Sequence, residues 1–131
     1  MSIEFSWLLD TAIAQKASDL HLSADSAPSV RVDGQLRTLD VPVYTREKAN
    51  DVVSTFIGHT WDEKIVANRK ELDFSFSYSN LRVRCNVFFV KGVLSASLRI
   101  LDNHAPDLAT LGAPEIINKL ILQKQGLLIV A

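Results

Sequence analysis

The hydrophobic positions of the chain change their spacing several times. Over roughly 3–17 and again over 45–57 they recur every three to four residues, as on one face of a helix. Both segments are therefore predicted to be helices that bury one side. Thr45 is placed to cap the second helix and Gly58 to end it. The residues of the two apolar faces are Phe5, Leu8, Leu9, Ala12 and Ile13, and then Ala49, Val52, Val53, Phe56 and Ile57.

A second group of segments alternates polar and apolar residues, as half-buried strands do. These segments are 19–22, 29–32, 35–38, 72–78, 81–90 and 93–101. Asp33-Gly34 connects 29–32 with 35–38, and Lys91-Gly92 connects 81–90 with 93–101. A connection of two such residues predicts a tight hairpin. A short helix is expected at about 60–70, where Thr60 and Glu63 have the spacing of a capping box. The order is helix, three strands, two helices and three strands, which predicts an α+β fold.

The last part of the chain follows a different pattern. Residues 103–112 contain Pro106 and Gly112 and are expected to form a connector. A helix is predicted from Pro114 to Gly126, with a buried face made of Ile116, Ile117, Leu120 and Ile121. The final five residues are apolar on both faces, as in a central parallel strand covered by helices. We therefore expect the chain to stop inside a second domain; the alternative is that these residues complete the first sheet as an edge strand.

Composition places the chain among globular proteins and narrows its partners. Its 131 residues are 47% hydrophobic and 22% charged, with a formal net charge of −1 spread along the chain. This balance argues against disorder and against a nucleic-acid partner. A single cysteine cannot form an internal disulfide, and the sequence has neither a signal peptide nor an apolar run of about 20 residues. A cytoplasmic protein without membrane insertion is expected.

Metal and nucleophile chemistry receive little support from the sequence. The three histidines, His21, His59 and His104, lie far apart without the spacing of metal ligands, so no metal site is predicted. His21 alternates with apolar residues and is interpreted as a hydrogen-bonded structural histidine rather than a catalytic one. Three further residues are interpreted as packing residues: Cys85, Trp7 and Trp61.

The clearest chemical signal is the register of the last hairpin. A two-residue turn at Lys91-Gly92 places Cys85 opposite Leu98 on an apolar face. On the other face the same register places Arg84 directly opposite Arg99. Arg82 lies two residues further along that side.

Two opposed arginines can be explained in two ways. Like charges across a ladder are destabilising, whereas two guanidinium groups about 5 Å apart suit a phosphoryl group. One hypothesis is therefore an anion site at Arg84 and Arg99. The alternative is that both arginines simply face solvent, with Asp73 or another acid nearby.

A set of short motifs extends along the whole chain. They are ASDLHL at 17–22, RVDG at 31–34, LDFSF at 72–76, RVRCN at 82–86, RIL at 99–101, LGAP at 111–114 and GLLIVA at 126–131. Together they resemble the N-terminal domain of the PilT-type type IV pilus retraction ATPases, within the type II/IV secretion ATPase superfamily. Cys85 stands where that family usually has valine, and Lys16 where it often has glycine.

This resemblance implies a specific domain organisation. Residues 1–102 are expected to form a PAS-like N-terminal domain, an antiparallel sheet with helices packed on one side. Residues 103–112 would be a linker. Residues 113–131 would supply the first helix and strand of a RecA-like ATPase domain, truncated before the phosphate-binding loop.

The resemblance also implies a function. The full-length protein would be a cytoplasmic hexameric ATPase at the inner membrane that uses ATP and Mg²⁺ to power pilus retraction and twitching motility. Arg84 and Arg99 match the two arginines that reach the nucleotide phosphates, and Arg82 is a further candidate. The implied partners are the RecA-like domain, neighbouring subunits and the inner-membrane platform protein of the pilus. By itself this chain, which has no phosphate-binding loop, is expected to hold no cofactor and to be inactive.

Two alternatives remain open at this stage. One is a pilus assembly or type II secretion ATPase of the same superfamily; these usually carry a further domain before this one, whereas only one helix precedes Ala17. The other is a stand-alone α+β module that binds a phosphorylated ligand at the arginine pair. A reading frame that continues into a glycine-rich loop ending in Gly-Lys-Ser or Gly-Lys-Thr would favour the motor.

Overall fold

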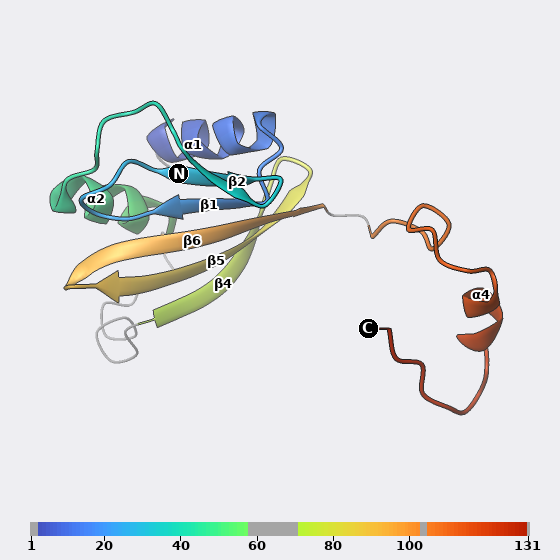
Figure 1. Ribbon diagram of the computed structural model, residues 1–131. Coiled ribbons are helices and arrows are strands. Elements are labelled where there is room, and N and C mark those ends of the chain that lie inside the picture. The colour runs from blue at the N-terminus through green and yellow to red at the C-terminus, as the bar shows by residue number, and fades with distance from the viewer. Residues whose placement is uncertain (1–2, 58–70, 103–104, 131) are drawn as a thin grey trace.

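An antiparallel sheet forms the centre of the molecule (Figure 1). The computed structural model describes residues 3–57, 71–102 and 105–130. Its strands are β1 (Asp19–Leu22), β2 (Ser29–Val32), β3 (Gln35–Thr38), β4 (Glu71–Tyr78), β5 (Leu81–Val90) and β6 (Val93–Asp102). Their order across the six-stranded sheet is β3-β2-β1-β6-β5-β4. The predicted α+β class is confirmed, and the pairing of β1 with β6 joins the first three strands to the last three.

Two tight hairpins set the local register as predicted. Asp33 and Gly34 have φ values of 49° and 78°, and Lys91 and Gly92 have 50° and 79°. Positive φ at both central residues is what a type I′ turn requires. The second hairpin places Arg84 opposite Arg99 and Cys85 opposite Leu98. The register predicted from the sequence is therefore confirmed.

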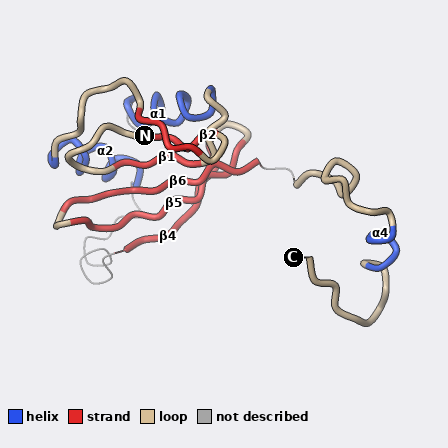
Figure 2. Tube along the Cα trace, viewed as in Figure 1, coloured by secondary structure: helices blue, strands red, loops and turns tan. Residues whose placement is uncertain are grey.

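Two helices cover one face of the sheet (Figures 1 and 2). They are α1 (Ile3–Ala14) and α2 (Arg46–Ile57), and Thr45 caps α2 through its hydroxyl, which accepts a hydrogen bond from the Lys48 amide at 3.2 Å. Glu4 joins the helices by accepting hydrogen bonds from Tyr44 and Lys48. The buried side chains between helices and sheet include Phe5, Leu8, Leu9, Ala12, Ala49, Val52, Val53, Ile57, Leu20, Val30, Val83, Cys85, Val87, Leu94, Ala96 and Leu98. Because side chains alternate along a strand, this packing leaves the opposite face of the sheet open.

The C-terminal segment differs from its prediction. Residues 116–120 form the short helix α4 (Ile116–Leu120), which has no buried residue, and Ile116 and Ile121 are each more than half exposed. Residues 127–130 form no strand, and the side chains of Leu127 and Val130 are 85% and 83% exposed. The helix is therefore shorter than predicted and its apolar face is exposed, and the described residues 127–130 do not join the first sheet as an edge strand. Because α4 and the residues after it lie apart from that sheet (Figure 1), their assignment to a second domain stays a prediction.

Other predictions are corrected or fall outside the described ranges. Trp7 is 48% exposed on α1 rather than packed inside, since the interior side of the helix is already filled by its aliphatic residues and Phe5. The predicted helix at 60–70 with Trp61, the stop at Gly58, and His59, His104 and Ala131 lie outside the described residues. Within the described ranges, no helix combines the length and the hydropathy needed to span a bilayer.

Candidate functional site

The open face of the sheet carries two neighbouring rows of polar residues. Strand register aligns the first row across five strands as Arg31, Asp19, Arg99, Arg84 and Ser75. The second row is Ser29, His21, Ser97, Asn86 and Asp73. Five strands thus contribute only polar side chains to this part of the surface.

A shallow cavity of about 310 Å³ lies on these rows. It is lined by Asp19, Glu71, Asp73, Arg84, Asn86, Ser97 and Arg99. The two arginines predicted as phosphate contacts are therefore brought to one cavity. Three carboxylates accompany them, so the cavity combines both signs of charge.

Arg84 is bound to Asp73 on the neighbouring strand β4. Its Nε donates to Asp73 Oδ1 at 3.2 Å and its Nη2 to Oδ2 at 2.5 Å, a two-point contact. Both side chains are largely exposed, at 66% and 43%. A surface ion pair of this kind contributes little to stability because water screens it, so it orients Arg84 more than it stabilises the fold.

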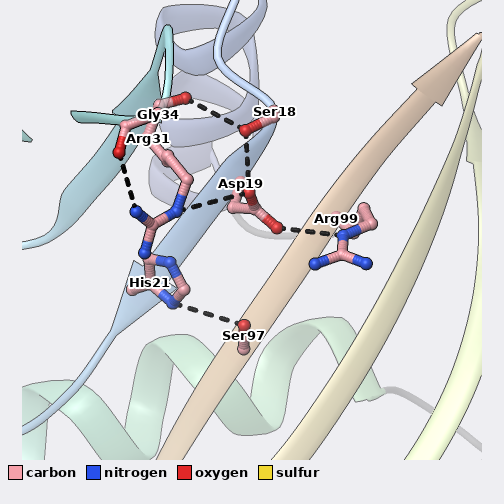
Figure 3. A network of polar contacts seen from close by, with 7 residues as sticks. All are labelled: Ser18, Asp19, His21, Arg31, Gly34, Ser97 and Arg99. Carbon is pink, nitrogen blue, oxygen red and sulfur yellow. Dashed lines mark hydrogen bonds and ion pairs between the residues drawn. The ribbon is translucent and has the colours of Figure 1, made fainter. Parts of the chain in front are cut away.

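Arg99 is bound to Asp19 on the other side of the pair. Its Nε donates to Asp19 Oδ1 at 3.1 Å. The other carboxylate oxygen of Asp19 accepts a hydrogen bond from Ser18 Oγ at 2.7 Å and lies 3.7 Å from Arg31 Nε. Figure 3 shows Asp19 between the two guanidinium groups. The Asp19 residue is only 7% exposed, so its charge is compensated within the protein rather than by water.

The two carboxylates change the electrostatic balance of the arginine pair. The positive charges of the two opposed arginines are compensated. Arg84 is paired with Asp73 on β4, and Arg99 is paired with Asp19 on β1. The pair is therefore compatible with a stable sheet without an anion, as the alternative with Asp73 nearby anticipated. An anion would compete with those carboxylates for the guanidinium groups.

Arg82 is placed differently from the other two arginines. Its guanidinium donates to Ser75 Oγ at 2.6 Å and to Ser77 Oγ at 3.4 Å. It lines a second hollow with Arg84 and Leu101 instead of the cavity that contains Arg99. Arg84 and its partner Asp73 are the residues that the two hollows share.

Comparison with known proteins identifies the domain. No protein-family model matches the chain. The type IV pilus ATPase PilU of Pseudomonas aeruginosa is 28% identical to this chain, over 97% of the chain and 33% of PilU. The type IV pilus retraction ATPase PilT of the same organism is 29% identical, over 94% of the chain and 36% of PilT. The crystal structure of the pilus retraction motor PilT with bound ADP superposes with a TM-score of 0.79 at 31% identity, over 96% of this chain and 36% of that one. The chain corresponds to the N-terminal domain of a PilT-type ATPase.

The chain spans about a third of the length of the curated relatives that it matches. The Legionella pneumophila ATPase DotB, at 20% identity and a TM-score of 0.71, shares the fold. The sequence likeness is therefore to type IV pilus ATPases, and the fold is shared with DotB as well.

Two other residues of the PilT-type domain behave as structural groups. The His21 ring is half-buried, and its Nδ1 lies 3.3 Å from Ser97 Oγ. Burial lowers the pKa of His21, and although Asp19 raises it, Arg31 lowers it further. Cys85 is fully buried, and this burial raises the pKa of its thiol to about 12. The buried thiol predicted from the sequence is confirmed. The hydrogen-bonded histidine is confirmed at Nδ1 only, because Nε2 is buried without a hydrogen-bond partner among the described residues.

Asp19 and Glu71 are the charged cavity residues that sequence reasoning missed, and Asp19 is the one that binds Arg99. Asp19 belongs to the ASDLHL motif, and the alternation of that segment already placed it on the polar face with His21. Nothing local indicated its contact with Arg99, which is 80 residues away in the chain. Only the pairing of β1 with β6 brings the two together.

Asp19 should make the stability of this domain sensitive to acid. Burial alone would raise its pKa, but the hydrogen bonds from Ser18 and Arg99 outweigh burial, so the net pKa is lowered. A lowered pKa stabilises the fold above the ordinary carboxyl value of about 3.9, and that stability is lost as pH falls through the pKa of the folded state. We expect the melting temperature to fall more steeply between pH 6 and pH 3 in the wild-type domain than in Asp19→Asn.

Thermal melts at several pH values test this expectation. Asp40→Asn, which removes an exposed carboxylate, is the matched control and should keep the wild-type slope. Equal slopes for Asp19→Asn and the wild type would show that the Asp19 carboxylate is not stabilised by folding.

Proposed function

We propose that this chain is the regulatory, nucleotide-clamping N-terminal domain of a hexameric ATPase that powers type IV pilus retraction. The observation that carries the proposal is the match to PilU and PilT along nearly the whole chain. The solved PilT structure contains ADP, which supports a nucleotide as the ligand of the complete protein. Its location would be the cytoplasmic face of the inner membrane, where it would act on the platform protein of the pilus.

The proposed organisation assigns a role to each part of the chain. Residues 1–102 would be the PAS-like domain, residues 103–112 the linker, and residues 113–131 the beginning of a RecA-like domain. The exposed apolar residues of 116–130 are consistent with a segment that is buried by the rest of a second domain. No phosphate-binding loop occurs in this sequence, so ATP and Mg²⁺ would be held by other parts of the complete protein.

The contribution of this chain to the reaction would be the arginine pair. Arg84 and Arg99 extend from adjacent strands into one cavity on the open face of the sheet. Their planar forks suit phosphate oxygens, and Arg82 could add a contact from the neighbouring hollow. When the domain closes over a nucleotide held by a RecA-like domain, the arginines would exchange their carboxylate partners for the phosphates. Closure and hydrolysis would thereby be coupled.

Deletion of the gene tests the biological role. We expect cells that still assemble surface pili but no longer retract them, and therefore lose twitching motility, with recovery when the gene is restored. Loss of the pili themselves would favour an assembly ATPase. An unchanged pilus phenotype would contradict the proposal and favour a module that binds another phosphorylated ligand.

The 131-residue chain by itself is predicted to hydrolyse no ATP and to bind nucleotide weakly at most. Two arginines can contact phosphate, but the backbone cradle and the magnesium ligands of a nucleotide hydrolase are missing from its sequence. A malachite-green phosphate assay on the purified chain measures this directly. Turnover above that of a mock purification would show that the domain contains a catalytic site of its own.

A further inference from the structure

The two arginines of the cavity are held in different ways. Arg84 uses both its Nε and its Nη2 to bind Asp73. Arg99 uses only its Nε to bind Asp19. Within the described part of the chain, the terminal nitrogens of Arg99 make no hydrogen bond or ion pair, and in Figure 3 they extend away from Asp19. The two terminal nitrogens of Arg99 are therefore available to donate hydrogen bonds to a ligand. The guanidinium of Arg84 can bind a ligand in this way only after its hydrogen bonds to Asp73 break.

The Asp19 carboxylate is held by contacts from three neighbouring residues. It is opposite Arg31 on β2 and Arg99 on β6 in the strand register. Ser18 donates to its Oδ2, and Arg31, which also donates to the Gly34 carbonyl at 3.1 Å, lies beside the same oxygen. With only 7% of the residue exposed, the carboxylate has little freedom to turn. Its Oδ1 is thus a rigid acceptor for Arg99 Nε.

The sharing of one carboxylate between two arginines also affects charge. Arg31 and Arg99 together carry two positive charges against the single negative charge of Asp19. Arg99 is consequently oriented by Asp19 without being neutralised by it. The pair formed by Arg84 and Asp73 is one to one, so its charges cancel.

We infer that Asp19 is a positioning residue, which holds Arg99 through Nε so that its two terminal nitrogens are ready to receive phosphate oxygens. This inference rests on the proposed function, because it assumes that Arg99 meets a phosphate. Asp73 has the opposite effect on Arg84: it occupies the guanidinium until a phosphate displaces it. Asp19 and Asp73, two of the three carboxylates of the cavity, therefore have opposite consequences for phosphate binding.

The first test uses the 131-residue chain without nucleotide. In proton–nitrogen NMR spectra, the Arg99 Nε–H should give a resolved side-chain signal with slow exchange, since it is hydrogen-bonded to a buried carboxylate. Asp19→Asn should move that signal and speed its exchange, while Asp73→Asn should leave it in place. An Arg99 signal that does not respond to Asp19→Asn would overturn the inference, whatever the protein does with ATP.

The second test measures steady-state ATP hydrolysis in the complete ATPase. Misplacing a group that contacts the transition state by about 1 Å costs roughly 100-fold in rate, so Asp19→Asn should lower kcat by about 10- to 100-fold with little change in KM. Asp40→Asn, which removes an exposed carboxylate away from the cavity, should leave kcat unchanged. In an Arg99→Lys background, Asp19→Asn should have little further effect, because lysine has no Nε contact separate from its charged end.

The outcomes separate the two proposals. If Arg99→Ala retains turnover, the proposed function of the arginines is lost. If Arg99→Ala abolishes turnover while folded Asp19→Asn retains it, only the positioning role is lost.

Where Asp19→Asn does not fold, Ser18→Ala takes its place, since it removes the hydroxyl that fixes the carboxylate and keeps every charge. It should lower kcat several-fold, and an unchanged kcat in Ser18→Ala would then contradict the inference.

Discussion

Alanine at Arg84 or Arg99 is expected to lower the ATP turnover of the complete ATPase by about 10³- to 10⁵-fold, the range found for arginines that stabilise the transferring phosphoryl group. Charge accumulates on that group in the transition state, and with the domain closure proposed above, a guanidinium shielded from water would stabilise the transition state more than the ground state. KM for ATP should therefore change much less than kcat. Coupled-enzyme kinetics on the two variants give both constants.

Stability must be measured with turnover, because the two arginines differ structurally. Arg84→Ala removes an exposed pair with Asp73 and should leave the free energy of unfolding nearly unchanged. Arg99→Ala leaves the buried Asp19 with Arg31 and Ser18 only, and should cost about 1–3 kcal/mol. Arg37→Ala, on the exposed edge strand β3, is the control and should change neither quantity. Near wild-type turnover in both arginine variants, or a loss explained fully by unfolding, would make the pair an ordinary structural feature.

The parts of the fold that depend on neighbouring residues could be predicted from the sequence. A two-residue turn at Lys91-Gly92 admits one tight register, and that register alone places Arg84 opposite Arg99. The same holds for the hairpin at Asp33-Gly34. Helix faces follow from spacing, with exceptions such as Trp7, since a helix stripe shows which residues can be buried but not how far the interior extends.

The parts that depend on distant pairing could not be predicted. Asp19 and Arg99 meet because β1 pairs with β6 in the middle of the sheet, and no local pattern specifies which distant strand a short segment will join. The hairpin register specifies the two cations of the cavity but not the carboxylates that compensate them, because Asp73 and Asp19 are on other strands. The apolar residues 127–130 show the same limit, because alternation and hydrophobicity do not identify the surface that a segment packs against.

A second large effect is expected one residue away from Arg99, on the other face of the same strand. Leu98 is fully buried and lies between Leu20 on β1 and Cys85 on β5. Leu98→Ala should lower the free energy of unfolding by about 2–5 kcal/mol, because it removes buried methyl groups and leaves a cavity between strands that are fixed by their ladders. Urea unfolding of the 131-residue chain, followed by circular dichroism, measures the loss.

Leu101→Ala is the matched control, since Leu101 is on the same strand but 44% exposed, and it should cost less than about 1 kcal/mol.

The two neighbours Leu98 and Arg99 should then separate stability from catalysis. Below its melting temperature, Leu98→Ala in the complete ATPase should keep near wild-type turnover per folded molecule, whereas Arg99→Ala should remain largely folded and lose turnover. Equal costs for Leu98→Ala and Leu101→Ala would mean that the interior is not packed on this face. A large loss of turnover in folded Leu98→Ala would mean that the core sets the position of β6 closely enough to control Arg99, because the strand transmits a shift of one face directly to the other.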